Sequence, residues 1–155
     1  MAGDWKLPWA GGCRCRQTRI AVSAPPLLAS ACHCRGCQTM SASAFSLTLA
    51  VPTRGFTITQ GEPVLGGLKG ATRHFFCPHC LSWMFTRPEQ LDDLVNLRPS
   101  TLDDHGWFAP FVEVWTSHKL PWAATSAPRS FVTQPDFLNY GALMAEYAEN
   151  GARPG

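Results

Sequence analysis

The chain has 155 residues, 45% of them hydrophobic by type, so it can bury one core, and its length favours a single domain. Charged residues make up 15% and the formal net charge is +2, with no run of like charges. A nucleic-acid surface would need a basic stripe, and a membrane span about 20 consecutive apolar residues, so both classes are excluded. The first residues lack the charged head and apolar stretch of a signal peptide, which predicts a cytoplasmic protein.

Short segments rich in β-branched and aromatic residues, bounded by turn residues, predict strands. In chain order they are 18–23, 44–51, 55–60, 64–65, 72–76, 83–86, 93–97 and 111–116. Glycine and proline number 13 each, which fits many short elements joined by turns. Only 139–148 has a helical pattern, with Gly151 beyond its end. We therefore expect a mainly β domain with a short C-terminal helix.

Seven cysteines fall into three groups, and their odd number in a reducing compartment favours metal ligation over disulfides. The groups are Cys13 with Cys15, then Cys32 with Cys34 and Cys37, then Cys77 with Cys80. The last has the Cys-Pro-x-Cys form of a zinc knuckle, which needs a second pair of ligands to complete a tetrahedron. Cys13 and Cys15 can supply that pair, giving a structural zinc site with four thiolates.

The remaining three thiols would leave one position of a second zinc ion open, as catalytic sites do. Three alternatives stay open on spacing alone: an open site, a redox or metal-storage cluster, or a site closed by His74, His105 or His118. Three thiolates around Zn²⁺ leave a net charge of about −1, which suits a soft sulfur ligand better than activated water. Arginines near the cysteines could offset this charge or hold a substrate carboxylate; they are Arg14, Arg16 and Arg35.

The cysteine groups and their surroundings resemble the glutathione-dependent formaldehyde-activating enzyme (Gfa) family, which includes the centromere protein V group. The resemblance is carried by 11–15, 32–38, 41–45 and 76–80, and fades after Trp122. It implies a β-tent of twisted antiparallel sheets stapled by zinc, spanning 8–123. Residues 124–155 would be an extension packed on this domain, ending in a short helix and a frayed tail.

The resemblance also implies two zinc ions per chain, a structural one on Cys13, Cys15, Cys77 and Cys80 and a catalytic one on Cys32, Cys34 and Cys37. The implied activity is that of a carbon–sulfur lyase, which forms or cleaves a thiohemiacetal such as S-hydroxymethylglutathione. Its partners would be a small thiol such as glutathione and an aldehyde, and a homodimer is compatible with it.

His33 is the histidine nearest to the second cluster and is a candidate for proton transfer. Because the chain turns back after Cys37, the expected substrate-binding residues are Arg35, Ser41, Ser43 and Phe45. The alternative function is a non-catalytic zinc module that presents an interaction surface to another protein. Its anchors would be exposed tryptophans, drawn from Trp5, Trp9, Trp83, Trp107, Trp115 and Trp122.

Two positions depart from the family pattern, which usually has glycine at both. Leu81 follows the second knuckle cysteine, and a leucine there would lose roughly 1–2 kcal/mol in a left-handed conformation. A remodelled knuckle turn with retained ligands is therefore expected. Ala42 adds a methyl group beside the expected pocket, which bears on substrate identity more than on metal binding.

Overall fold

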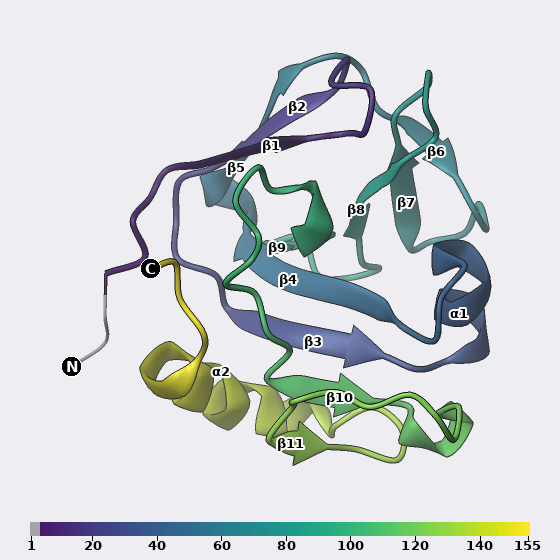
Figure 1. Ribbon diagram of the computed structural model, residues 1–155, viewed down its shortest axis with the longest axis vertical. Coiled ribbons are helices and arrows are strands. Elements are labelled where there is room, and N and C mark those ends of the chain that lie inside the picture. Colours follow the sequence, from purple (N-terminus) through teal and green to yellow (C-terminus); the bar gives the residue numbers. More distant parts are fainter. Residues whose placement is uncertain (1–3) are drawn as a thin grey trace.

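The computed structural model describes residues 4–155, which form two β-sheets, two α-helices and four short 3-10 helices. The smaller sheet has the order β1-β2-β5 and the larger one the order β11-β10-β3-β4-β9-β8-β7-β6 (Figure 1). The strands are β1 (Trp9–Gly12), β2 (Arg19–Val22), β3 (Leu28–Cys32), β4 (Ser46–Pro52), β5 (Phe56–Gln60), β6 (Val64–Gly66), β7 (Arg73–Phe76), β8 (Trp83–Arg87), β9 (Leu94–Leu97), β10 (Val112–Val114) and β11 (Arg129–Ser130). The 3-10 helices are η1 (Thr53–Gly55), η2 (Pro99–Thr101), η3 (Thr116–His118) and η4 (Phe137–Asn139). The expectation of a mainly β chain is confirmed.

Strand pairing departs in one place from the expected antiparallel sheets. Strand β10 runs parallel to β3 on one side and to β11 on the other, while the remaining described ladders are antiparallel. The chain reaches β10 from η2 through a long irregular connection, so β10 does not have to form a hairpin with its neighbour.

The prediction that only the C-terminal segment is helical is wrong. Besides α2 (Tyr140–Asn150), the chain forms α1 (Arg35–Ser41), which lies between the end of β3 and the start of β4 (Figure 1). Cys34 caps α1, because its sulfur accepts a hydrogen bond from the backbone N–H of Cys37 at 3.4 Å. Ala42 closes the helix in a left-handed conformation with φ 50°. The second cysteine group is therefore the N-terminal turn of a helix.

The core lies between the sheets and under α2. Strand β4 contributes Leu49 and Val51, and the neighbouring β9 contributes Val95 and Leu97, all fully buried. Tyr147 of α2 is also fully buried among the aromatic rings beneath the sheet. Helix α2 thus brings C-terminal residues into the same core. No helix in the described part of the chain is long and apolar enough to cross a membrane.

Candidate functional site

Four thiols from two hairpin turns meet at one point. Cys13 and Cys15 follow β1, whereas Cys77 and Cys80 lie between β7 and β8, and all four sulfur atoms lie within 4.8 Å of one another. The sulfurs of Cys13 and Cys15 are 3.4 Å apart, and those of Cys15 and Cys77 are 3.8 Å apart. Sulfurs around a tetrahedral Zn²⁺ at 2.3 Å would be about 3.8 Å apart, so this set fits a closed metal site. The site joins the smaller sheet to the larger one.

The knuckle turn keeps its left-handed residue even though that residue is leucine. Leu81 has φ 57°, its N–H donates to the carbonyl of Cys77, and the N–H of Cys77 donates to Ser82. The expected remodelling is therefore not seen. Its side chain is 68% exposed, so packing offsets little of the backbone strain. Both departures from the family pattern, Leu81 and Ala42, place a side chain where the backbone favours glycine.

Replacing this leucine by glycine should stabilise the protein. Leu81→Gly removes roughly 1–2 kcal/mol of left-handed strain. Glycine in turn lowers the stability by about 0.5–1 kcal/mol, because it loses more conformational entropy on folding than leucine does. We expect a net gain of up to about 1.5 kcal/mol, measured as a higher melting temperature in zinc-containing buffer. Leu81→Ala keeps the strain and is the control; an equal gain in both variants would mean that backbone strain is not the cause.

The other three thiols gather where β3 meets α1. The sulfurs of Cys32, Cys34 and Cys37 lie within 4.8 Å of one another, and each residue is partly exposed. The hydrogen bond with Cys32 lowers the pKa of the Cys37 thiol to about 5, although burial opposes this shift. The same hydrogen bond raises the pKa of Cys32. Three neighbouring thiols that share a negative charge in this way are suited to bind a metal cation through their three sulfur atoms.

No histidine of the described residues joins this cluster. His74 has its Nδ1 2.9 Å from the hydroxyl of Thr86, and His105 has its Nδ1 2.8 Å from the carbonyl of Leu102. His118 is exposed and stacks on Trp115. Among the described residues the structure gathers only these three sulfurs here, a number of ligands that would leave one position of a tetrahedral site open.

His33 lies between two cysteines of the cluster but is fully buried. Its Nε2 is 2.9 Å from Oε2 of Glu113 on β10, and its Nδ1 has no hydrogen-bond partner. Its ring also packs edge-on against Phe45, with the ring centroids 5.4 Å apart. His33 therefore ties the cysteine loop to β10.

Glu113 is a buried carboxylate surrounded by donors. Besides His33, its oxygens accept hydrogen bonds from Lys119, from Thr125 at 2.9 Å and from Ser130 at 2.7 Å. Burial raises the pKa of Glu113, but the hydrogen bonds, that from Ser130 foremost, outweigh it and hold the pKa at about 2. The carboxylate thus stays ionised and anchors the loop that carries the second cluster. Sequence analysis missed this residue.

A second missed residue is Arg98, which follows β9. Only 7% of it is exposed, and its guanidinium lies over the ring of Trp83 at 4.1 Å. Burial lowers its pKa to about 10, opposed by the thiols of Cys37 and Cys32. A cation that interacts with the thiols of the second cluster is therefore Arg98, which is not one of the three arginines named from the sequence.

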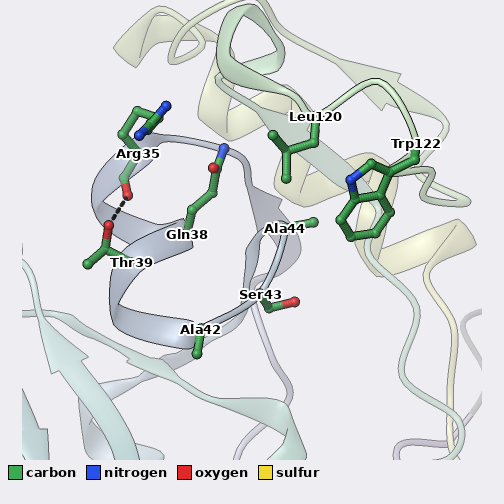
Figure 2. A pocket seen from close by; sticks show the side chains of 8 residues that line it. All are labelled: Arg35, Gln38, Thr39, Ala42, Ser43, Ala44, Leu120 and Trp122. Carbon is green, nitrogen blue, oxygen red and sulfur yellow. Dashed lines mark hydrogen bonds between the residues drawn. The ribbon is translucent and has the colours of Figure 1, made fainter.

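Those three arginines line two surface depressions. Arg14 and Arg16 line a polar depression beside the first cysteine group, where Arg16 is 4.0 Å from Asp103. Arg35 is exposed on α1 and lines a different depression, of about 510 Å³, between that helix and the segment before Trp122 (Figure 2).

The depression on α1 contains two of the four expected substrate-binding residues. Arg35 and Ser43 line it, and Leu120 and Trp122 line its other side (Figure 2). Ser41 does not, since its hydroxyl donates to the carbonyls of Cys37 and Phe45. Phe45 is likewise absent from the lining, and its ring packs on the imidazole of His33.

Gln38 holds the two sides of this depression together. Its Nε2 donates to the carbonyl of His33 at 2.7 Å and to that of His118 at 3.0 Å. The side chain therefore connects α1 both to the cysteine loop and to η3, which precedes the segment with Leu120.

Comparisons with known proteins place these features in a family. The model of the glutathione-dependent formaldehyde-activating enzyme family matches residues 8–118, a span that includes all seven cysteines. Among solved structures, the crystal structure of a Rhodobacter sphaeroides protein is similar, with a TM-score of 0.51 and 18% identity, covering 61% of this chain and 87% of that chain. At this identity the likeness concerns the fold alone. The comparison with curated proteins gives no match. The family match extends over most of the chain and agrees with the cysteine geometry, so the chain belongs to the glutathione-dependent formaldehyde-activating enzyme family.

Proposed function

We propose that the protein is a carbon–sulfur lyase that forms or cleaves a thiohemiacetal from a small thiol, such as glutathione, and an aldehyde. The observation that carries this proposal is the three-thiol cluster, to which no described protein group adds a fourth ligand. The family match supports the same chemistry. In the forming direction, a sulfur–carbon bond forms, the carbonyl π bond breaks, and the proton of the thiol passes to the new hydroxyl.

Zinc is the proposed metal, with two ions per chain. At Cys32, Cys34 and Cys37 it would supply Lewis acidity and a position for a soft sulfur ligand. The four thiols of the first cluster would hold a structural ion, and the two sheets that this ion would join would form the β-tent implied by the family. A reducing, cytoplasmic location would keep all seven thiols available as ligands.

The chain's own groups would position the reactants. Arg35 and Ser43 line the depression on α1 and could orient a carboxylate of the thiol substrate. The imidazole of His33 is fully buried and paired with Glu113. His33 can therefore orient the cysteine loop, but it is poorly placed to transfer a proton at the surface. We therefore assign it a positioning role. The 8–123 domain and the 124–155 extension would act together, because Thr125 and Ser130 donate to the same carboxylate.

The proposal predicts that glutathione changes the second metal site and that this response needs Cys37. Cys37→Ser should stay folded, lose one zinc and lose the response to glutathione. Zinc content, thermal melting and turnover of formaldehyde with glutathione are the measurements. A Cys37→Ser protein that still responds to glutathione as the wild type does would place the thiol site elsewhere and contradict the proposal.

The alternative, a zinc module that serves only as an interaction surface, would need exposed aromatic anchors. Of the six tryptophans, Trp122 is exposed at 74%, Trp5 is buried, and the remaining four are partly buried. One exposed ring on the rim of the depression gives the alternative less support than the open cluster gives the enzyme. A wild-type protein that holds two zinc ions but shows no response to any small thiol would favour the module.

A further inference from the structure

Arg98 is a buried cation without an acidic side chain as its partner. None of the salt bridges among the described residues includes it. Its Nη2 donates to the carbonyl of Asn96 at 3.3 Å, and its Nε is buried with no hydrogen-bond partner. A buried unpaired charge is strongly destabilising, so a compensating negative charge is expected nearby.

The sheet places that negative charge at the second cysteine cluster. Strand β4 lies between β3 and β9 and pairs Ser46 with Cys32 and Leu49 with Leu97. Arg98 follows Leu97 directly, and β9 runs antiparallel to β4. Arg98 therefore lies towards the Ser46 end of β4, which is the end that pairs with Cys32. The thiols of Cys37 and Cys32 lie close enough to the guanidinium to act on it electrostatically. Trp83 covers the guanidinium, which keeps its charge out of solvent and strengthens its interaction with nearby groups.

The charges of a loaded centre explain why a cation is needed there. Three thiolates and one divalent ion sum to −1, and a thiolate as fourth ligand makes the sum −2. A fixed positive charge stabilises both states, and it stabilises the one with the added thiolate more.

We propose that Arg98 is the counter-cation of the Cys32–Cys34–Cys37 centre, which helps to retain its metal ion and favours an anionic sulfur ligand in the open position. The preference for sulfur rests on the proposed function, whereas retention of the metal does not. Arg98 is thus a positioning residue that acts through the charge of the centre.

The test is competition with a chelator for the second zinc ion of the purified protein. Arg98→Met removes the charge and keeps an apolar chain against Trp83. Arg153→Met is the matched control, because Arg153 also stacks on a tryptophan, Trp5, at 3.9 Å. It belongs to the C-terminal segment, whose end lies away from α1 (Figure 1). We expect Arg98→Met to release the second ion at a chelator concentration at least about tenfold lower than the control does. Arg98→Lys should restore most of the retention because it keeps the charge.

Equal release by Arg98→Met and Arg153→Met would overturn the proposal. So would failure of Arg98→Lys to restore retention, because the shape of the guanidinium would then matter and its charge would not. If Arg98→Met does not fold, the comparison of Arg98→Lys with Arg98→Gln isolates the charge in the same way.

A second arm titrates glutathione against the zinc-loaded variants. Arg98→Met should bind glutathione at least about tenfold more weakly than Arg153→Met. Equal affinities would overturn the preference for an anionic ligand. A wild-type protein that does not bind glutathione overturns the proposed function and the sulfur preference together, while the chelator arm still decides the role of Arg98 in metal retention.

Discussion

Cys77→Ser should abolish the folded state. The thiols of Cys77 and Cys15 stand 62 residues apart in the chain, and their cluster joins the smaller sheet to the larger one. Metal binding at a structural zinc site supplies about 10–16 kcal/mol in small zinc domains. A whole domain is stable by only about 5–15 kcal/mol. Cys77 is fully buried, so the variant would also leave a polar hydroxyl among unpaired thiols.

The measurement is a thermal melt with a zinc count, and Cys37→Ser is the matched control. That cysteine belongs to a cluster confined to Cys32–Cys37, where a metal ion closes only a short loop and cross-links little of the chain. We expect Cys77→Ser to aggregate or show no cooperative transition, whereas Cys37→Ser melts cooperatively. Similar damage in both variants would mean that the second cluster is a structural staple as well.

The strands that the sequence predicts are those with an apolar, β-branched pattern. Strand β3 was missed because its segment, LASAC, consists mostly of small residues with low strand propensity. Ala29 and Ala31 are nevertheless fully buried, and α2 packs against this strand. Strand β1 was missed because it ends in two glycines. At Gly11 a side chain would come within 2.5 Å of the carbonyl of Thr101, so only glycine allows this close approach.

Helix α1 carried no pattern to recognise. None of its residues is buried, so it lacks the apolar face on which helix prediction depends. Its start is fixed instead by the sulfur of Cys34, a cap that sequence rules do not include among the usual Ser, Thr, Asp and Asn. The same chemistry that forms the second cluster therefore also forms the helix.

The cysteine groups were predictable because each is local in sequence, while their charged partners are not. Arg98 reaches the second cluster only through the order β3-β4-β9, and Glu113 reaches it through the parallel pairing of β10 with β3. One signal was available for Glu113. It is the single charge inside the apolar segment FVEVW, and a charge in the middle of a buried strand needs partners.

Glu113→Gln should destabilise the protein by about 3–5 kcal/mol, because removing one partner leaves the other buried groups uncompensated. The carboxylate accepts hydrogen bonds from Ser130, Thr125 and Lys119 and contacts the buried imidazole of His33. A glutamine would direct an N–H group at one of these donors and would leave Lys119 without its negative partner. The loss should appear as a melting temperature lower by roughly 6 °C or more.

Glu146→Gln is the matched control, since Glu146 pairs with Arg129 at the surface, where their side chains are 32% and 49% exposed. An exposed pair contributes about 0–1 kcal/mol, so this variant should melt close to the wild type.

The pKa of Glu113 is lowered to about 2 in the fold. Its contribution is therefore complete above the unfolded pKa of about 4.3 and is lost as the pH falls towards 2. The gap between wild type and Glu113→Gln should accordingly be constant above about pH 5 and narrow below it. A gap no larger than that of Glu146→Gln, or one that does not change on acidification, would show that the buried carboxylate does not anchor the cysteine loop.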